Sequence, residues 1–282
     1  MSLVRSLIGP LKAFIDRFPR MAMIFRSVRD QLDFLKKSIV TPWGFKLAGN
    51  VSMAQGSFEP EETELIRGLL KDVDVFVNVG ANVGYYCCHA LSLGKHVIAF
   101  EPLQRNFRYL RQNIKVNGWT DVELFPVALS DRVGVLDIYG GDTGASLIKG
   151  WAGAPESYVT SVPVSTMNLM LGDRLRGKKA LVVVDIEGAE KWMLEGASKI
   201  LANDPRPIWF MEITAKDNQP RGVAINPNFK STFQIFFEKG YQAFNVHQGT
   251  RSINMEDVDL VIKDRSRISG YNFIFCDPSI KV

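Results

Sequence analysis

Apolar residues follow two alternating patterns through most of the chain. Short, mainly apolar runs, which indicate buried strands, occur at residues 75–79, 96–100, 122–128, 180–186 and 208–213. Around them, apolar residues recur every three or four positions, which indicates helices at residues 85–93, 104–116, 189–201 and 229–239 and another that begins at Glu61. The run at 180–186 has apolar side chains on both faces, as in a parallel sheet. The pattern therefore predicts an α/β fold with a doubly wound, mostly parallel sheet.

The remaining segments carry weaker signals. Residues 133–139 and 158–165 alternate between apolar and polar positions and are predicted as further strands, with a loop rich in glycine, alanine and serine between them. Residues 241–246 and 271–276 are predicted as closing strands that form an antiparallel edge, separated by a long connection at residues 247–270. Residues 41–60 are predicted as a loop or a short hairpin.

The first 40 residues differ from the rest of the chain. Their apolar residues form two amphipathic helical patterns separated by Pro19, and residues 1–37 carry eight basic and three acidic side chains. Because the whole chain has a net charge of only +4, the excess of positive charge lies in this arm. We expect a helical extension at residues 1–40 and one main domain at residues 41–282. The arm either packs on that domain or provides a peripheral membrane contact, a partner contact or a homodimer contact.

Composition excludes several classes of protein. Hydrophobic residues make up 46% of the chain and charged residues 23%, which is typical of soluble globular proteins. Three cysteines form no disulfide framework, and no apolar run approaches the roughly 18 residues that a membrane span needs. We therefore expect a cytoplasmic protein. The three histidines and three cysteines lack ligand spacing, so we expect no metal site.

The stretch VFVNVGANVGYYCC at residues 75–88 joins a strand to a helix through a tight turn. Gly80 and Gly84 allow such a turn and close packing of the helix, and Asn82 tolerates a left-handed backbone. Glu101 ends the next strand, 21 residues after Gly80, where a carboxylate can accept hydrogen bonds from a ribose. The same geometry serves a dinucleotide or S-adenosylmethionine (SAM), or it is a packing turn without any ligand.

The dinucleotide fingerprint requires glycine at positions 80, 82 and 85, whereas this chain has Asn82 and Tyr85. These side chains crowd a pyrophosphate, which needs bare backbone. The loop therefore favours SAM, and an NAD-dependent oxidoreductase is a more distant alternative.

Ordered blocks of sequence between residues 41 and 276 resemble the FkbM-type methyltransferases. The resemblance implies a class I methyltransferase fold, in which a Rossmann-like sheet has seven strands. It also implies a SAM-dependent O-methyltransferase that acts on a hydroxyl of a sugar, a glycoside or a related small molecule and leaves S-adenosylhomocysteine. The blocks are GSFEPEE (56–62), VFVNVGANVGYY (75–86), VIAFEP (97–102), NFRYLRQNIKVNG (106–118), VALSD (127–131), VVDIEGAE (183–190) and FMEI (210–213).

The resemblance also implies a set of cofactor-binding residues. Those of the glycine loop are expected around the methionine end of SAM, Glu101 at the ribose, residues 128–130 along the adenine and Asp185 near the methyl group. The expected set is Asn78, Gly80, Ala81, Asn82, Gly84, Tyr85, Glu101, Pro102, Leu103, Ala128, Leu129, Ser130 and Asp185.

Two positions depart from the family pattern. Asn78 stands where the family usually has aspartate, and STMNLML at residues 165–171 replaces a segment that usually carries two acids. Losing the negative charge at position 78 weakens attraction for a cationic cofactor. This departure keeps open a catalytically degenerate protein that retains the fold as a binding module.

Methyl transfer to a hydroxyl requires positioning and removal of a proton. Asp185, Glu187 and Glu212 follow the fourth and fifth predicted strands and are the candidate catalytic carboxylates. Carboxylates close together raise one another's pKa, as a general base near neutrality requires. Each also has a structural interpretation: Asp185 as a positioning group, Glu187 as a helix cap, and Glu212 as a packing residue.

The acceptor is expected to be a small molecule or a glycan. The fourth strand ends in DIEG and lacks the proline-rich aromatic segment of enzymes that methylate base amines, and no nucleic-acid-binding module is visible. We therefore expect no nucleic-acid partner, although the basic arm leaves a nucleic-acid methyltransferase as an alternative.

Overall fold

The computed structural model describes residues 37–248, 252–263, 268 and 270–280, together with Gln31 and Phe34. The amphipathic arm expected at residues 1–40 lies almost wholly outside these residues, so its helices and the boundary at residue 40 remain predictions. Within the described ranges, no helix combines the length and the apolar content needed to cross a membrane.

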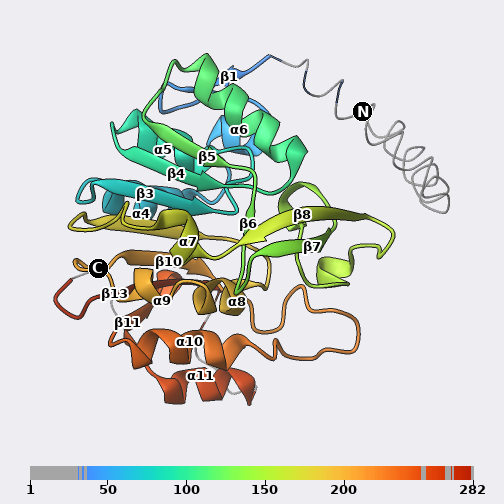
Figure 1. Ribbon diagram of the computed structural model, residues 1–282, viewed down its shortest axis with the longest axis vertical. Coiled ribbons are helices and arrows are strands. Elements are labelled where there is room, and N and C mark those ends of the chain that lie inside the picture. The colour runs from blue at the N-terminus through green and yellow to red at the C-terminus, as the bar shows by residue number, and fades with distance from the viewer. Residues whose placement is uncertain are drawn as a thin grey trace.

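Eight strands form the central sheet of the described part of the chain, in the order β12–β11–β13–β10–β9–β3–β4–β5 (Figure 1). The five strands from β10 to β5 are parallel, whereas β13 pairs antiparallel with both β10 and β11. The strands are β3 (Val75–Val79), β4 (His96–Phe100), β5 (Val122–Phe125), β9 (Ala180–Val184), β10 (Ile208–Glu212), β11 (Gln242–Asn245), β12 (Ser252–Ile253) and β13 (Asn272–Cys276). The doubly wound, mostly parallel sheet is thus confirmed. The two-residue strand β12 adds an eighth strand, antiparallel to β11, at the outer edge.

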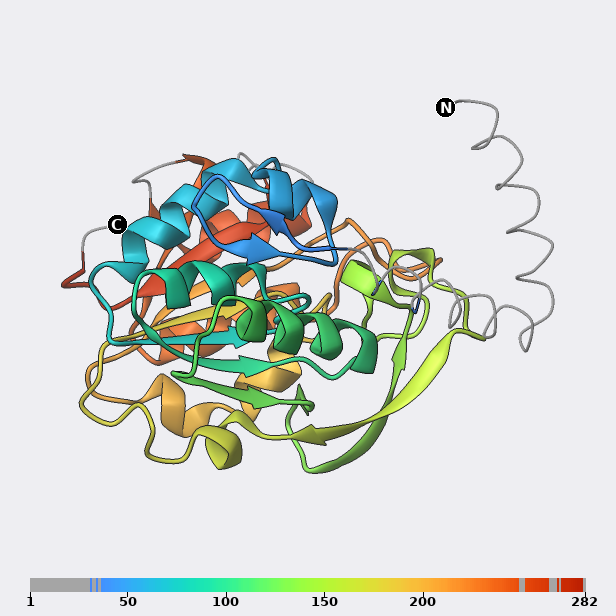
Figure 2. The same cartoon turned by 90° about the horizontal axis from the view of Figure 1, so that it is seen from above.

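Helices cover both faces of this sheet (Figures 1 and 2). Alternate side chains of β3 show this, because Phe76 packs among residues of α5 and α6 whereas Val77 packs among residues of α8 and α10. One face carries the hairpin of β1 (Ile39–Val40) and β2 (Lys46–Leu47) with α3 (Val51–Gln55), α4 (Pro60–Leu70), α5 (Tyr85–Ser92) and α6 (Gln104–Val116). The other face carries α7 (Met167–Leu171), α8 (Glu190–Glu195), α9 (Ser198–Leu201), α10 (Phe229–Glu238) and α11 (Met255–Ile262). Burial on both faces explains why the central strands are apolar throughout.

A second sheet extends from the main body as a ribbon (Figures 1 and 2). It consists of β6 (Ala128–Leu129), β8 (Val159–Ser165) and β7 (Gly134–Tyr139), in that order. The single strand predicted at residues 122–128 was wrong, because the chain leaves the main sheet after Phe125 and resumes as β6 in the ribbon. Pro126 lies at this transition and has no N–H to donate to a ladder. Two single-turn 3-10 helices, Asp142–Gly144 and Trp151–Gly153, lie in the connection from β7 to β8, and a third is Val246–Gln248.

Three further predictions need correction. The helix predicted at residues 189–201 is divided into α8 and α9 near Gly196, and the strand predicted at 180–186 already ends at Val184. The long connection expected at residues 247–270 contains β12 and α11, two elements that the sequence pattern did not predict. Helix α11 begins with a capping box in which Asn254 and Asp257 satisfy each other's backbone N–H groups, a signal that is readable in the sequence.

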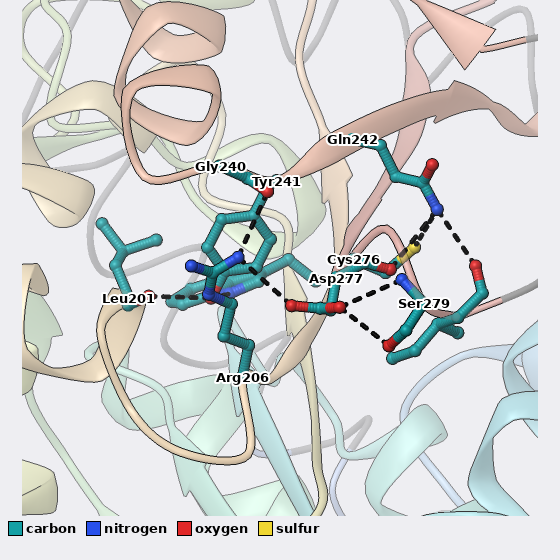
Figure 3. A network of polar contacts seen from close by, with 10 residues as sticks. Leu201, Arg206, Gly240, Tyr241, Gln242, Cys276, Asp277 and Ser279 are labelled. Carbon is teal, nitrogen blue, oxygen red and sulfur yellow. Dashed lines mark hydrogen bonds and ion pairs between the residues drawn. The ribbon is translucent and has the colours of Figure 1, made fainter.

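A polar network links several chain segments at the edge of the sheet where the parallel strands begin (Figure 3). Arg206 donates from its Nη1 to the carbonyl oxygen of Gly240 and to Oδ2 of Asp277, both at 3.2 Å. Gln242 donates from its Nε2 to the carbonyl oxygen of Ile280 at 3.0 Å. These contacts tie the segment after β13 to the rest of the sheet and leave the opposite, carboxyl edge to form clefts.

Candidate functional site

The turn after β3 is shaped by backbone contacts with its two neighbouring strands. The N–H groups of Gly80 and Ala81 donate to the carbonyl oxygen of Phe100 at 3.0 and 2.9 Å. Gly80 has a φ of +82°, and a Cβ at this position would lie 1.9 Å from the carbonyl oxygen of Asp185. Only glycine fits such an approach, so the strand ends of β3 and β9 are held together without an intervening side chain. Asn82 has a φ of +51°, as its tolerance of left-handed backbone predicts.

Glu101 connects this turn to the end of β4. Its Oε2 accepts the N–H of Asn82 and its Oε1 accepts the N–H of Leu103, both at 2.8 Å. The side chain is buried, and this desolvation raises the pKa of Glu101 to about 7 despite the two backbone hydrogen bonds and a third from the side chain of Asn106. A carboxylate has about four lone-pair sites, so Glu101 keeps acceptor capacity for a hydroxyl.

Two adjoining pockets lie at the carboxyl edge of the sheet. The first pocket is lined by the predicted residues Glu101, Pro102, Leu103, Ala128 and Leu129. The second pocket is lined by the predicted residues Asn78, Ala81, Tyr85 and Glu212. Both pockets share Gly80, Asn82, Thr143, Asp185 and Glu187. The structure therefore brings most of the predicted set to one continuous cleft.

Two residues of the predicted set do not line either pocket. Gly84 is the N-cap of α5, where a Cβ would lie 2.5 Å from Cδ1 of Leu110. Ser130 is buried behind β6, and its Oγ donates to Oδ1 of Asp131 at 3.1 Å. Both support the shape of the cleft from behind it.

Four carboxylates line the second pocket: Glu59, Asp185, Glu187 and Glu212. Among its lining residues there is no lysine, arginine or histidine. The register of β9 and β10 pairs Val184 with Met211, so Asp185 and Glu212 follow at neighbouring strand ends. The pocket is thus an acidic cleft with no basic side chain in its walls.

Glu59 and Glu187 already have hydrogen-bond partners. The hydroxyl of Tyr86 donates to Oε2 of Glu59 at 2.7 Å, and Nε1 of Trp151 donates to Oε2 of Glu187 at 2.6 Å. Asn218 provides a second side-chain hydrogen bond to Glu187. Desolvation raises the pKa of both carboxyls, and these donors oppose the shift.

Asp185 and Glu212 differ, because no side-chain hydrogen bond involves either carboxylate among the described residues. Asp185 is exposed at the cleft and Glu212 is partly buried, yet protein atoms crowd around both carboxyl groups. This desolvation, and next the repulsion between the clustered carboxylates, raises the pKa of both groups well above the ordinary range. Two such groups at neighbouring strand ends can hold one proton between them and accept a second from a ligand.

The sequence pattern assigned no role to Glu59, although this residue lies in the GSFEPEE block. It adopts a left-handed conformation with a φ of +40° directly before Pro60. Thr143, Ala145 and Leu147 were also missed; they enter the first pocket from the connection between β7 and β8. A loop without a motif gives no signal of which side chains turn inward.

Among the described residues, no group of three or more His, Cys, Asp or Glu side chains is arranged to hold a metal ion.

Residues 78–243 match the family model described as "Methyltransferase FkbM domain". A comparison with curated proteins found no match. Solved structures that match include precorrin-6y C5,15-methyltransferase from Geobacter metallireducens GS-15, with 10% identity, a TM-score of 0.41, and coverage of 83% of this chain and 93% of that one. The tRNA (uracil-54, C5)-methyltransferase of Pyrococcus abyssi in complex with S-adenosyl-L-homocysteine matches with 11% identity, a TM-score of 0.40, and coverage of 82% and 42%. The TYW2 protein of M. jannaschii in complex with AdoMet matches with 13% identity, a TM-score of 0.39, and coverage of 82% and 79%.

Proposed function

Because the chain belongs to the FkbM family of SAM-dependent methyltransferases, we propose that it methylates a hydroxyl of a sugar, a glycoside or a related small molecule. The observation that carries this proposal is the pair of adjoining pockets. The first combines a carboxylate with an apolar wall, as a nucleoside requires, and beside it the second presents two carboxylates without side-chain partners among the described residues.

The residues of the first pocket fit SAM. Glu101 retains acceptor capacity for a ribose hydroxyl beside its three donors, and Ala128 and Leu129 provide an apolar wall for the adenine. Gly80 keeps the floor free of side chains where the backbone of β3 and that of β9 meet. Asp185, at the junction of the two pockets, provides negative charge for a sulfonium.

When bound, SAM supplies a methyl group made electrophilic by its sulfonium. The chain's own contribution is to orient the acceptor oxygen and to remove its proton. Asp185 and Glu212, whose pKa values are both raised, share one proton, and the ionised member of the pair accepts the hydroxyl proton as the oxygen attacks. The exposed ring of Tyr271 in the second pocket offers a face on which a sugar ring can stack.

The alternatives receive less support from the cleft. A nucleic-acid substrate requires cations near its phosphates, whereas the lining of the second pocket is acidic. A purely non-catalytic module has no need of two unpartnered carboxylates with raised pKa values, which are costly in a binding wall.

Glu212→Gln tests the proposed chemistry, because glutamine keeps the size of the side chain but can neither accept a proton nor share one with Asp185. We expect transfer of tritiated methyl from SAM to a panel of glycosides to fall by about 100-fold or more. The Kd for SAM, measured by titration calorimetry, should stay within about threefold, because Glu212 lines only the second pocket.

Glu238→Gln on the exposed end of α10 is the matched control and should leave both quantities unchanged. Full activity of Glu212→Gln would contradict the role of this carboxylate. Tight binding of SAM by the wild type without transfer to any hydroxyl would favour the non-catalytic alternative, and methylation of RNA would exclude the proposed acceptor class.

A further inference from the structure

Glu187 shares a left-handed backbone with Glu59, another carboxylate of the cleft. It has a φ of +55°, in the left-handed region that non-glycine residues seldom adopt, and it is followed by Gly188 at +95°. Such a conformation persists only where surrounding contacts determine it, and it often marks a functional constraint.

Those contacts come from two loops that are distant in sequence. From the connection between β7 and β8, the Oγ of Ser146 donates to the carbonyl oxygen of Glu187 at 2.6 Å, and Nε1 of Trp151 donates to its Oε2 at 2.6 Å. From the connection after β10, the side chain of Asn218 makes a further hydrogen bond to the same carboxylate. A single residue at the end of β9 is thus bound by both loops.

The two loops are also packed closely around this point. Trp151 is only 1% exposed although it lies in a surface connection. Its ring covers Gly188, where a Cβ would lie 2.5 Å from Cζ3 of the indole. The N–H of Ala152 donates to the carbonyl oxygen of Asn218 at 2.7 Å, so the loops are joined to each other as well.

We propose that Glu187 is a positioning residue that fastens the 140–158 and 214–228 loops over the cleft, and that it is not the proton acceptor. Its carboxylate is held by Trp151 and Asn218, whereas Asp185 and Glu212 have no such partners. The 140–158 loop places Thr143 in both pockets and Ala145 and Leu147 in the first. Through these side chains the position of the loop determines the shape of the site.

Hydrogen–deuterium exchange of the full-length protein without ligand tests this role. We expect Glu187→Ala to speed amide exchange by about tenfold or more in peptides covering 140–158 and 214–228, because both loops lose a shared anchor. Glu187→Gln should stay within about twofold of the wild type, since its amide oxygen still accepts the indole N–H and its NH2 can donate to Asn218. Asp185→Asn makes the same charge change without a tethered partner and should also leave both peptides unchanged.

Trp151→Phe removes the indole donor together with part of the buried ring that covers Gly188, and should also speed exchange in both peptides. If Glu187→Ala raises exchange throughout the protein, the Trp151→Phe variant becomes the test. Faster exchange of Trp151→Phe in the two loops alone supports the proposal, and exchange at wild-type rates overturns it. Unchanged loops in Glu187→Ala, or equal effects of the alanine and glutamine variants, also overturn it. The anchoring role of Glu187 deepens the proposed function and rests on it. The exchange measurement needs neither SAM nor an acceptor, so the anchoring role and the proposed methyl transfer can fail independently.

Discussion

Single residues in the cleft acquire their roles from their neighbours rather than from their chemical type. Glu59 and Glu187 are held by hydroxyl, indole and amide donors, whereas Asp185 and Glu212 have no side-chain partner among the described residues. All four have raised pKa values, and burial together with repulsion from Asp185 raises the pKa of Glu212 to about 10, so the cleft does not carry four negative charges at neutral pH.

The neutral side chain of Asn78 is also explained by its neighbours in the acidic pocket. It is buried in β3 and its Nδ2 donates to Sγ of Cys87 at 3.5 Å. An aspartate at this position would add a fifth carboxylate to the acidic pocket, where desolvation and repulsion would raise its pKa as well. The neutral side chain avoids that cost and leaves the charge of the cleft to Asp185 and its neighbours.

Glu101 predicts a pH dependence of SAM binding. A free-state pKa of about 7 means that the group is largely protonated at pH 6 and ionised at pH 8. Because the ribose hydroxyls donate to the ionised form, binding should be about tenfold tighter at pH 8 than at pH 6, and Glu101→Gln should remove the slope.

Titration with S-adenosylhomocysteine separates this effect from that of the other carboxylates. The two compounds share the ribose but differ in charge at sulfur, so a slope due to Glu101 must appear with both. A slope seen with SAM alone would assign the titration to the carboxylates near the sulfonium instead.

At the scale of elements, the break between α8 and α9 is coupled to the wall of the first pocket. A Cβ at Gly196 would lie 2.1 Å from the carbonyl oxygen of Ser130, the residue after β6. The carbonyl oxygen of Gly196 also accepts the N–H of Asn168 at 2.9 Å. The chain bends here because β6 and α7 approach its backbone, so a continuous helix would collide with them.

Gly196→Ala should therefore destabilise the protein by about 1–3 kcal/mol, the usual cost of forcing atoms into a packed interior. Gly68→Ala is the matched control, because Gly68 lies in α4 and a Cβ added there would meet no side chain or other segment within 4 Å. That variant should stabilise the protein by roughly 0.5–1 kcal/mol through helix propensity. Urea unfolding measures both changes, and equal effects of the two substitutions would contradict the close approach.

For the whole molecule, the buried acids make stability depend on pH. Glu190 is 2% exposed, and burial raises its pKa to about 7 although its Oε1 accepts the N–H of Gly188 at 2.8 Å. A carboxyl with a raised folded-state pKa contributes its full stability below the unfolded-state value near 4.5, and loses it as pH rises towards 7. Above that pH both states are ionised and the loss is complete.

Glu190→Gln should remove this loss. Relative to the wild type, the variant should gain roughly 2–3 kcal/mol of unfolding free energy on going from pH 5 to pH 8, since each pKa unit corresponds to about 1.4 kcal/mol. Denaturant unfolding at the two pH values measures the difference. Glu238→Gln, at an exposed position, should show no such change, and a flat response of Glu190→Gln would disprove the role of its burial.

Much of this protein is determined by local sequence. Apolar runs specified the strands β3, β4, β9 and β10, because a strand covered on both faces must be apolar throughout. Periodic apolar positions specified α4, α5, α6 and α10, and the glycine turn with Glu101 specified where the first pocket begins. These features depend on backbone conformation and on burial, which neighbouring residues in the sequence encode.

Only the tertiary structure decided how the carboxylates divide between anchors and reactive groups. Glu187 is held by Trp151 and Asn218, which are 36 and 31 residues away in the chain, and Glu59 by Tyr86, 27 residues away. Likewise, position 196 requires glycine because the carbonyl oxygen of Ser130 lies against it. A desolvated group's pKa and a loop's position follow from which distant segments meet, and that information is absent from any short stretch of sequence.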